Sequence, residues 1–120
     1  MSKTLLFLYG TLKSGQRNHH LIAGQVFRGP AETCPFYRLY QLDWCPALKL
    51  DDTNGLAVKG ELWEVDEVIL HKLDLFEGTP DWYRRDEIAI RDCFDTVWAY
   101  FHNQEIPSGT VSGDEWPFPC

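Results

Sequence analysis

Runs of apolar residues, broken by glycine, proline and short polar stretches, divide the chain into strands and helices. Residues 3–9 form a run rich in large apolar side chains that ends at Gly10, and this length and flanking glycine predict a buried strand. A polar loop over residues 11–17 follows. Asn18 is suited to cap a short helix, which we predict over residues 19–25.

The middle of the chain has the composition of strands. Residues 36–42 are rich in aromatic side chains and predict one strand. Residues 47–50 and 56–65 predict two more, joined by a polar segment that ends in Asn54-Gly55. Because Asn-Gly favours the backbone of a tight hairpin turn, we predict that these two strands pair with each other.

A helix is predicted over residues 67–76. Asp66 is suited to be its N-cap, and Gly78 and Pro80 end it. Apolar side chains recur on one helical face, which predicts the side that packs against a sheet. The residues of this face are Val65, Ile69, Leu73 and Phe76.

The pattern as a whole predicts one α+β domain over residues 1–120. Strands are predicted over residues 82–91 and 96–102, and residues 104–120, with three prolines and two glycines, predict an irregular tail. Five or six strands with two main helices, and only one obviously helical crossover, favour a mixed sheet that closes toward a small barrel. A length of 120 residues suits a single core.

Composition and charge exclude several kinds of partner. The net charge is −7, and Arg84-Arg85 is the only adjacent pair of basic residues, so we expect no nucleic acid partner. The N-terminal apolar run is shorter than the core of a signal peptide, and no stretch reaches the length of a membrane span. We therefore expect a cytoplasmic protein with no membrane partner, and its size favours a monomer.

Cysteines and histidines give no metal motif. No Cys-x-x-Cys or His-Glu-x-x-His spacing occurs, so we expect no metal, surface histidines and free thiols, the first three of them partly buried. A Cys–His nucleophile pair stays open, because such pairs meet only in space. The residues concerned are Cys34, Cys45, Cys93, Cys120, His19, His20, His71 and His102.

The loop after the first strand has the glycine spacing of a phosphate-binding loop, with Gly10 and Gly15 five residues apart. Gln16 and Arg17 follow where that motif needs lysine and a hydroxyl residue, which excludes nucleoside triphosphate binding. The backbone N–H groups of such a loop can still converge on an anion. The alternative is a simple turn that ends a strand.

Glu77 is the acidic residue with the most distinctive surroundings. It follows Phe76 at the end of the predicted helix and precedes the aromatic pair Trp82-Tyr83. A carboxyl held against aromatic rings loses hydration, which raises its pKa and suits it to general acid–base catalysis. The alternative is a solvated glutamate at a helix end. Asp74 is a second candidate for the acid–base role, but it is more simply interpreted as a solvated residue of the helix.

Several blocks of the sequence resemble the γ-glutamyl cyclotransferase-like family, and within it the γ-glutamylamine cyclotransferases. Two blocks are specific together, Phe-Leu-Tyr-Gly-Thr-Leu-Lys-Ser-Gly-Gln-Arg-Asn-His-His at residues 7–20 and Leu-Asp-Leu-Phe-Glu-Gly at 73–78. Shorter matches are Tyr-Arg-Leu-Tyr at 37–40, Pro-Ala-Leu at 46–48, Gly-Glu-Leu at 60–62, Tyr-Arg-Arg at 83–85 and the late strand with Tyr100. The chain departs from the pattern at Phe36, where glycine is common, and at Cys45, where tyrosine is common.

The resemblance implies a barrel-like α+β fold and a reaction that needs no cofactor. In that reaction the α-amine of a γ-glutamyl group attacks its own δ-carbonyl, which releases 5-oxoproline and an amine. It implies Glu77 as general acid/base. The residues expected to hold the substrate are Tyr9, Gly10, Thr11 and Leu12, with Tyr83 and Arg85 supporting the pocket or the α-carboxylate.

The sequence alone leaves three alternatives to this function open. The enzyme can act on γ-glutamyl amino acids instead of γ-glutamyl amines, or the domain can bind small γ-glutamyl compounds or anions without turnover. A cysteine hydrolase, the third class, would release glutamate instead of the lactam. For Arg85 the alternative is an exposed strand residue.

Overall fold

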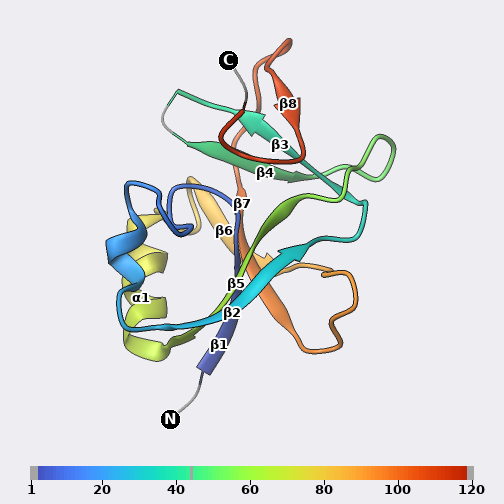
Figure 1. Ribbon diagram of the computed structural model, residues 1–120. Coiled ribbons are helices and arrows are strands. Elements are labelled where there is room, and N and C mark those ends of the chain that lie inside the picture. The colour runs from blue at the N-terminus through green and yellow to red at the C-terminus, as the bar shows by residue number, and fades with distance from the viewer. Residues whose placement is uncertain (1–2, 44, 119–120) are drawn as a thin grey trace.

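The computed structural model describes residues 3–43 and 45–118, so Cys120 lies outside the described residues. Strands dominate this part of the chain, with one α-helix and one short 3-10 helix (Figure 1). The strands are β1 (Lys3–Leu8), β2 (Val26–Glu32), β3 (Tyr37–Gln41), β4 (Pro46–Leu50), β5 (Lys59–Asp66), β6 (Tyr83–Glu87), β7 (Val97–His102) and β8 (Ser112–Gly113). The helices are the 3-10 helix η1 (His19–Ile22) and α1 (Glu67–Phe76).

The strands form a five-stranded sheet and a three-stranded sheet. The larger has the order β2-β5-β1-β7-β6, in which β1 and β7 are parallel and the other neighbours antiparallel. The smaller has the order β4-β3-β8 and lies above the end of the larger sheet in Figure 1. The mixed sheet and the α+β class are confirmed. The tail is otherwise irregular but contributes β8, which pairs with β3.

The neighbouring strands β1 and β7 are buried on both faces, which explains their unbroken apolar sequences. In β1, Phe7 packs into a core between the two sheets, whereas Leu6 and Leu8 pack into a second core beneath α1. In β7, Phe101 and Tyr100 divide between the same two cores. Side chains alternate across a strand, so each strand serves both cores at once.

The five-stranded sheet curls until its two edges meet at one end. Thr33, just after β2, bridges Ile90, which follows β6. The Cys34 N–H donates to the Ala89 carbonyl at 2.9 Å, which adds a further link between the same segments. The edges meet only there, so the sheet is barrel-like without forming a closed barrel. This agrees with the predicted tendency toward closure.

The predicted hairpin around Asn54-Gly55 is wrong. β4 pairs with β3, and β5 pairs with β1 and β2. Neither Asn54 nor Gly55 has the positive φ of a tight hairpin turn. Instead the loop folds back on Phe36 and Tyr37, because the Asp51 N–H donates to the Phe36 carbonyl and the Leu56 N–H to the Tyr37 carbonyl.

The helix α1 has the predicted bounds and cap. The Asp66 carboxylate accepts a hydrogen bond from the Ile69 N–H at 2.8 Å. The second predicted helix, over residues 19–25, shrinks to the 3-10 turn η1. Asn18 does not cap it, because its side-chain amide donates to the Thr11 hydroxyl at 3.0 Å, and Gly24 has a φ of +83° that ends the turn.

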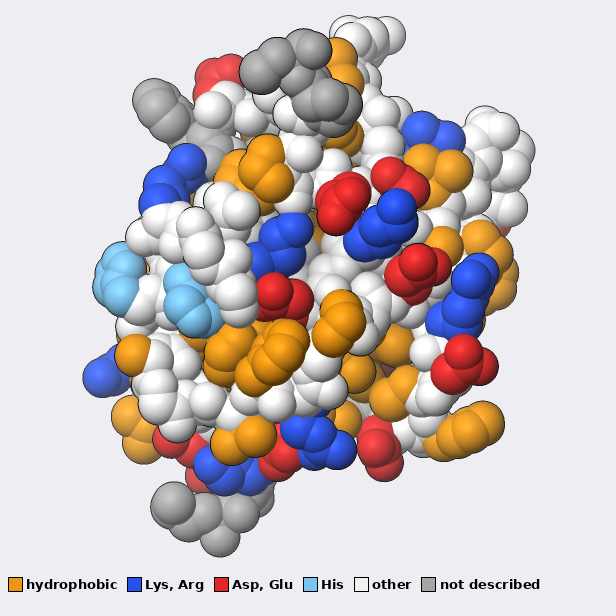
Figure 2. All heavy atoms as spheres, in the orientation of Figure 1, with side chains coloured by type: hydrophobic (Ala, Val, Ile, Leu, Met, Phe, Trp, Pro, Cys, Tyr) orange, Lys and Arg blue, Asp and Glu red, His pale blue; other side chains and the backbone are white. Residues whose placement is uncertain are grey.

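The face of the molecule seen in Figure 2 carries basic and acidic side chains mixed together over β2 and β5. Three ion pairs bring such side chains together, Arg28–Glu64, Lys59–Asp114 and Arg91–Glu32. Among the described residues no helix has both the length and the apolar character to span a membrane.

Replacement of Thr33 tests a buried hydrogen bond beside the point where the two edges of the sheet meet. The fully buried Thr33 hydroxyl accepts the Val58 N–H at 2.9 Å, and Thr33→Val leaves that N–H without a partner at nearly constant volume. We expect a loss of about 1–3 kcal/mol in urea unfolding and faster exchange of the Val58 amide. Thr33→Ser keeps the hydroxyl and should preserve protection at Val58. Equal exchange in both variants would contradict the role of this hydrogen bond.

Candidate active site

A cavity of about 430 Å³ lies at the carboxyl ends of the parallel strands β1 and β7, next to the end of α1. Parallel neighbours end at the same edge of a sheet, so the residues that follow them are brought together although about 90 positions separate them. Of the predicted site residues, the cavity lining includes Tyr9, Gly10, Thr11, Leu12, Glu77 and Tyr83. Arg85 is not part of the lining.

In the loop after β1, the carbonyl groups of Gly10, Thr11 and Leu12 accept hydrogen bonds, whereas their N–H groups have no acceptor among the described residues. The carbonyl oxygens of Gly10, Thr11 and Leu12 accept hydrogen bonds from the Lys13 N–H, the Asn18 N–H and the His19 ring, at 3.1, 3.0 and 2.9 Å. The three N–H groups of the same residues donate to no acceptor in the described part of the chain. This loop therefore presents consecutive unpaired donors at the cavity wall, as an anion or oxyanion site requires.

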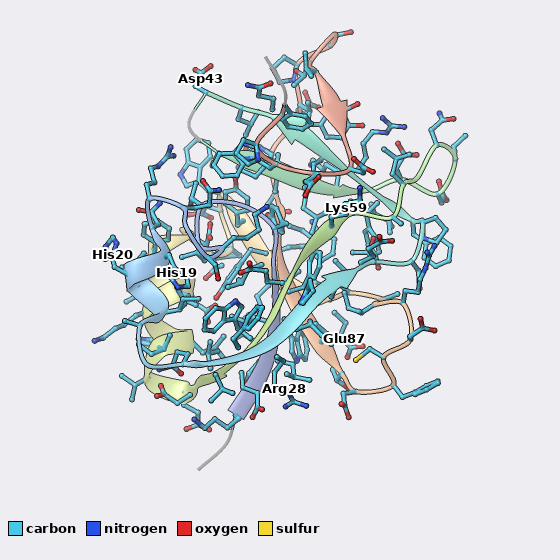
Figure 3. All side chains as sticks on the ribbon, in the orientation of Figure 1. His19, His20, Arg28, Asp43, Lys59 and Glu87 are labelled. Atoms are coloured by element: carbon cyan, nitrogen blue, oxygen red, sulfur yellow. The ribbon has the colours of Figure 1, made fainter. Side chains whose placement is uncertain are left out.

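The His19 side chain stabilises the conformation of this loop. Its Nδ1 lies 2.9 Å from the Leu12 carbonyl, and its ring meets Trp63 edge-on with the centroids 5.2 Å apart. His20, the next residue on the same short helix, is exposed (Figure 3). The two neighbouring histidines thus differ in role, since His19 holds the backbone of the loop and His20 faces solvent.

Glu77 is the C-cap of α1. Its N–H donates to the Leu73 carbonyl at 2.8 Å, and Gly78 follows with a φ of +67°, which turns the chain away sharply. The carboxyl has no hydrogen bond or ion pair with any described residue. Burial alone raises the pKa of Glu77 to about 7.

Three tyrosines line the same cavity as this carboxyl. Burial raises the pKa of Tyr9, Tyr83 and Tyr100 first, and the charge of Glu77 adds to the rise in each case. The Tyr9 hydroxyl donates to the Tyr100 carbonyl, and the Tyr83 hydroxyl donates to the Pro46 carbonyl at 3.1 Å. The aromatic wall predicted for Glu77 is thus made mainly of tyrosines with fixed hydroxyls.

Asp74, the rival carboxylate, is locked in a structural pair. The Arg85 guanidinium donates to both its oxygens at 2.9 and 3.0 Å, and the Tyr100 hydroxyl donates to it at 2.7 Å. Desolvation acts to raise the pKa of Asp74, but the hydrogen bonds from Arg85 and Tyr100 outweigh it and hold the pKa below its ordinary value. Arg85 therefore supports the cavity indirectly, because it holds the acceptor of Tyr100.

Five further residues line the cavity that were not predicted to belong to the site. His102 was expected at the surface, but it is buried, and its ring packs on Tyr83 at 5.2 Å between centroids. Burial lowers the pKa of His102, which favours the neutral ring. The residues are Arg17, Asn18, Cys45, Tyr100 and His102. Tyr100 and His102 stand at the end of an apolar strand, which the fold places beside β1. That position in the sequence was the signal from which they could have been predicted.

Of the described cysteines, Cys34 and Cys93 lie outside the cavity lining, whereas Cys45 belongs to it. Cys34, Cys45 and Cys93 are free and partly buried, as predicted. Cys45 Sγ lies 3.2 Å from the Tyr83 hydroxyl. In residues 3–43 and 45–118, no three histidine, cysteine or acidic side chains gather as a metal site requires.

Comparison with known proteins shows the family to which the chain belongs. A family described as "Gamma-glutamyl cyclotransferase, AIG2-like" matches residues 6–118. A Vibrio cholerae protein provisionally named gamma-glutamylcyclotransferase is 39% identical over 112 residues, which cover 92% of this chain and 93% of that protein. The gamma-glutamylaminecyclotransferase of Rattus norvegicus is 38% identical over 96 residues. These residues cover 72% of this chain and 62% of the rat protein.

A solved structure of an AIG2-like protein has the same fold as this chain. The crystal structure of an AIG2-like protein from Mus musculus superposes with a TM-score of 0.85 and 28% identity, over 97% of this chain and 89% of that one. The chain belongs to the gamma-glutamyl cyclotransferase, AIG2-like family, and its class of enzyme is a cyclotransferase. The resemblance found in the sequence is confirmed.

The unpaired carboxyl of Glu77 should reduce stability at neutral pH. A native pKa of about 7, above the ordinary 4.5, means that the folded state binds the proton more tightly than the unfolded state. The free energy of unfolding then falls as pH rises from about 4.5 to about 7. We expect Glu77→Gln to be more stable than the parent by up to about 3 kcal/mol at pH 8, and the gain to vanish below about pH 4.5.

Urea unfolding at several pH values measures this difference. Glu67→Gln, on the exposed first turn of the same helix, is the matched control and should show no such gain. If Glu77→Gln were no more stable than the parent at pH 8, the carboxyl would not be desolvated.

Proposed function

We propose that this chain is a γ-glutamylamine cyclotransferase with Glu77 as its general acid/base. The α-amine of the γ-glutamyl group attacks its own δ-carbonyl, a C–N bond closes the five-membered lactam, and the original amide C–N bond breaks. The products are 5-oxoproline and a free amine. The observation that carries the proposal is one cavity that holds both an unpaired carboxyl with a pKa of about 7 and three unpaired backbone N–H groups.

The γ-glutamyl unit has two charges, an α-carboxylate and an α-ammonium. Arg17 is the one Lys or Arg side chain among the described residues of the lining, so it receives the α-carboxylate. Glu77 receives the α-ammonium. The Tyr83 hydroxyl, which donates to Pro46, keeps lone pairs that accept from the same ammonium.

The unpaired N–H groups of Gly10, Thr11 and Leu12 face the δ-carbonyl. When the amine attacks, the carbonyl oxygen becomes an oxyanion, and donors fixed in advance stabilise that charge without having to reorganise. His19 and Asn18 hold the opposite side of this loop, which keeps the donors in place. Tyr9 closes the wall beside them through its bond to the Tyr100 carbonyl.

Glu77 carries the proton from one nitrogen to the other. As a carboxylate it takes a proton from the α-ammonium, which frees the nucleophile, and as an acid it gives one to the departing amine. A pKa of about 7 lets one carboxyl do both near neutral pH. Ring closure is intramolecular, so a cavity that holds the folded conformer removes much of the entropic barrier.

Replacement of Glu77 tests the proton transfer. Glu77→Gln keeps the volume and the fold but cannot accept the proton, so kcat for 5-oxoproline release from γ-glutamyl amides should fall about 10²–10⁴-fold. Mass spectrometry of 5-oxoproline measures the rate, and circular dichroism checks the fold. Glu67→Gln serves as the control on the same helix. Turnover of Glu77→Gln within a few-fold of the parent would exclude Glu77 as the acid/base.

The pH dependence of kcat/KM provides an independent test. The free enzyme must hold Glu77 as a carboxylate, so kcat/KM should rise with pH and level off above a pKa of about 7. We expect this limb in the parent between about pH 5 and about pH 9, and its loss in the residual activity of Glu77→Gln. A limb near the ordinary carboxyl pKa of 4.5 would contradict the desolvated state of Glu77.

A further inference from the structure

A carboxylate next to the donor loop, residues 10–12, accepts three hydrogen bonds on one oxygen. The Glu61 Oε1 atom accepts the Ser14 N–H at 2.9 Å, the Ser14 hydroxyl at 3.2 Å and the Trp63 Nε1–H at 3.1 Å. Residues 10–12 line the active-site cavity, whereas Glu61 lines a second cavity of about 700 Å³ together with Lys13 and Ser14. Glu61 therefore lies on the other side of the loop from the reacting groups.

A glycine brings Glu61 within reach of this loop. The strands β5 and β1 are antiparallel, and Glu61 pairs with Leu8, the last residue of β1. A Cβ at Gly60 would come within 2.5 Å of the Leu8 carbonyl oxygen and 2.6 Å of the Phe7 ring. Because glycine permits this close approach, the next side chain of β5 reaches the segment that leaves β1.

The first connection from Glu61 to the donor loop is through Ser14. The Lys13 N–H donates to the Gly10 carbonyl at 3.1 Å, so residues 10–13 form one turn and Ser14 is the first residue after it. Ser14 is exposed, and Glu61 accepts from both its N–H and its hydroxyl. Hydrogen bonds to a charged acceptor are stronger than those to a neutral one, so this contact fixes the carboxyl end of the turn.

The second connection from Glu61 to the donor loop is through Trp63 and His19. The Trp63 ring, which is 7% exposed, donates its N–H to Glu61 and meets the His19 ring edge-on. His19 Nδ1 in turn lies 2.9 Å from the Leu12 carbonyl oxygen. Both connections reach the loop at its carboxyl end, so loss of the Glu61 carboxylate would loosen the same segment in two ways.

We propose that Glu61 is a positioning residue, which holds the N–H groups of residues 10–12 in the direction that the oxyanion of the reaction requires. This role rests on the proposed cyclotransferase reaction. Such donors stabilise a transition state because their direction is fixed before the reaction begins. A displacement of about 1 Å at an active site can cost about 10²-fold in rate. The Glu61 carboxylate transfers no proton and acts only by accepting hydrogen bonds.

A general contribution to folding is the competing role for Glu61. The strand that carries it is already held on both sides, because the backbone of β5 pairs with β1 and with β2. The side-chain bonds of Glu61 instead lead to Ser14 and Trp63, which both connect to the donor loop. The geometry therefore favours an effect on the loop over an effect on the sheet.

Variants at Glu61 separate the two roles by kinetics. Glu61→Gln keeps an oxygen acceptor, so kcat for 5-oxoproline release should stay within about threefold of the parent. Glu61→Ala removes the acceptor, and kcat should fall about 10–100-fold while KM changes by less than about threefold, because the donors act mainly in the transition state. The rise of kcat/KM around the Glu77 pKa of about 7 should be the same in the parent and both variants.

Glu64→Ala is the matched control on the same strand. The Glu64 side chain pairs with Arg28 of β2, so its loss should leave kcat within about threefold of the parent. Urea unfolding and circular dichroism check that every variant is folded at the assay temperature. Equal losses of kcat in Glu61→Ala and Glu64→Ala, or a loss in Glu61→Gln as large as in Glu61→Ala, would overturn the positioning role.

NMR of the free protein tests the loop without the reaction. In Glu61→Ala the amide signals of residues 10–12 should shift and broaden, whereas in Glu61→Gln and Glu64→Ala they should match the parent. If the parent releases no 5-oxoproline from γ-glutamyl amides, the proposed reaction is wrong, and these signals still decide whether Glu61 holds the loop. Unchanged loop signals in Glu61→Ala would overturn the proposal even if the reaction is confirmed.

Discussion

The parallel pairing of β1 with β7 is the constraint on which the site depends. The two strands run in the same direction, so their carboxyl ends lie at one edge of the sheet, and both strands pack into both cores. The chain that leaves β1 forms the donor loop, and the end of β7 supplies Tyr100 and His102. Because the strands are fixed by two cores at once, neither end can shift without disturbing packing on both sides.

The elements that were predicted correctly from the sequence are those that local interactions determine. The helix 67–76 with its Asp66 cap and the strand 3–9 follow from periodicity and capping, and both are confirmed within a residue. The Asn54-Gly55 hairpin failed because pairing there is decided by contacts with Phe36 and Tyr37, which no local pattern shows. The same limit applies to Arg17 and His102, since only the folded chain brings them to the cavity.

Two acidic residues one turn apart on the same helix end illustrate how surroundings set chemistry. Asp74 points to Arg85 and Tyr100, and its pKa is held below the ordinary value. Glu77 has no such partner and its pKa rises to about 7. Opposite shifts in neighbouring carboxyls mark one as structural and the other as a candidate for proton transfer. The sequence ranked Glu77 above Asp74 because of its aromatic neighbours, but the partners that hold Asp74 appear only in the folded chain.

The arrangement also explains why Glu77 is left unpaired. A basic partner would stabilise its carboxylate and lower the pKa, as Arg85 does for Asp74, and the residue would then be a poor acid for the leaving amine. The fold instead leaves this carboxyl in a cavity with three tyrosines, each of whose hydroxyls donates to a group other than Glu77. The stability lost at Glu77 is thus the same free energy that keeps its proton available near neutral pH. A substrate ammonium supplies the missing partner only while it is bound, so pairing and proton transfer occur at the same carboxyl.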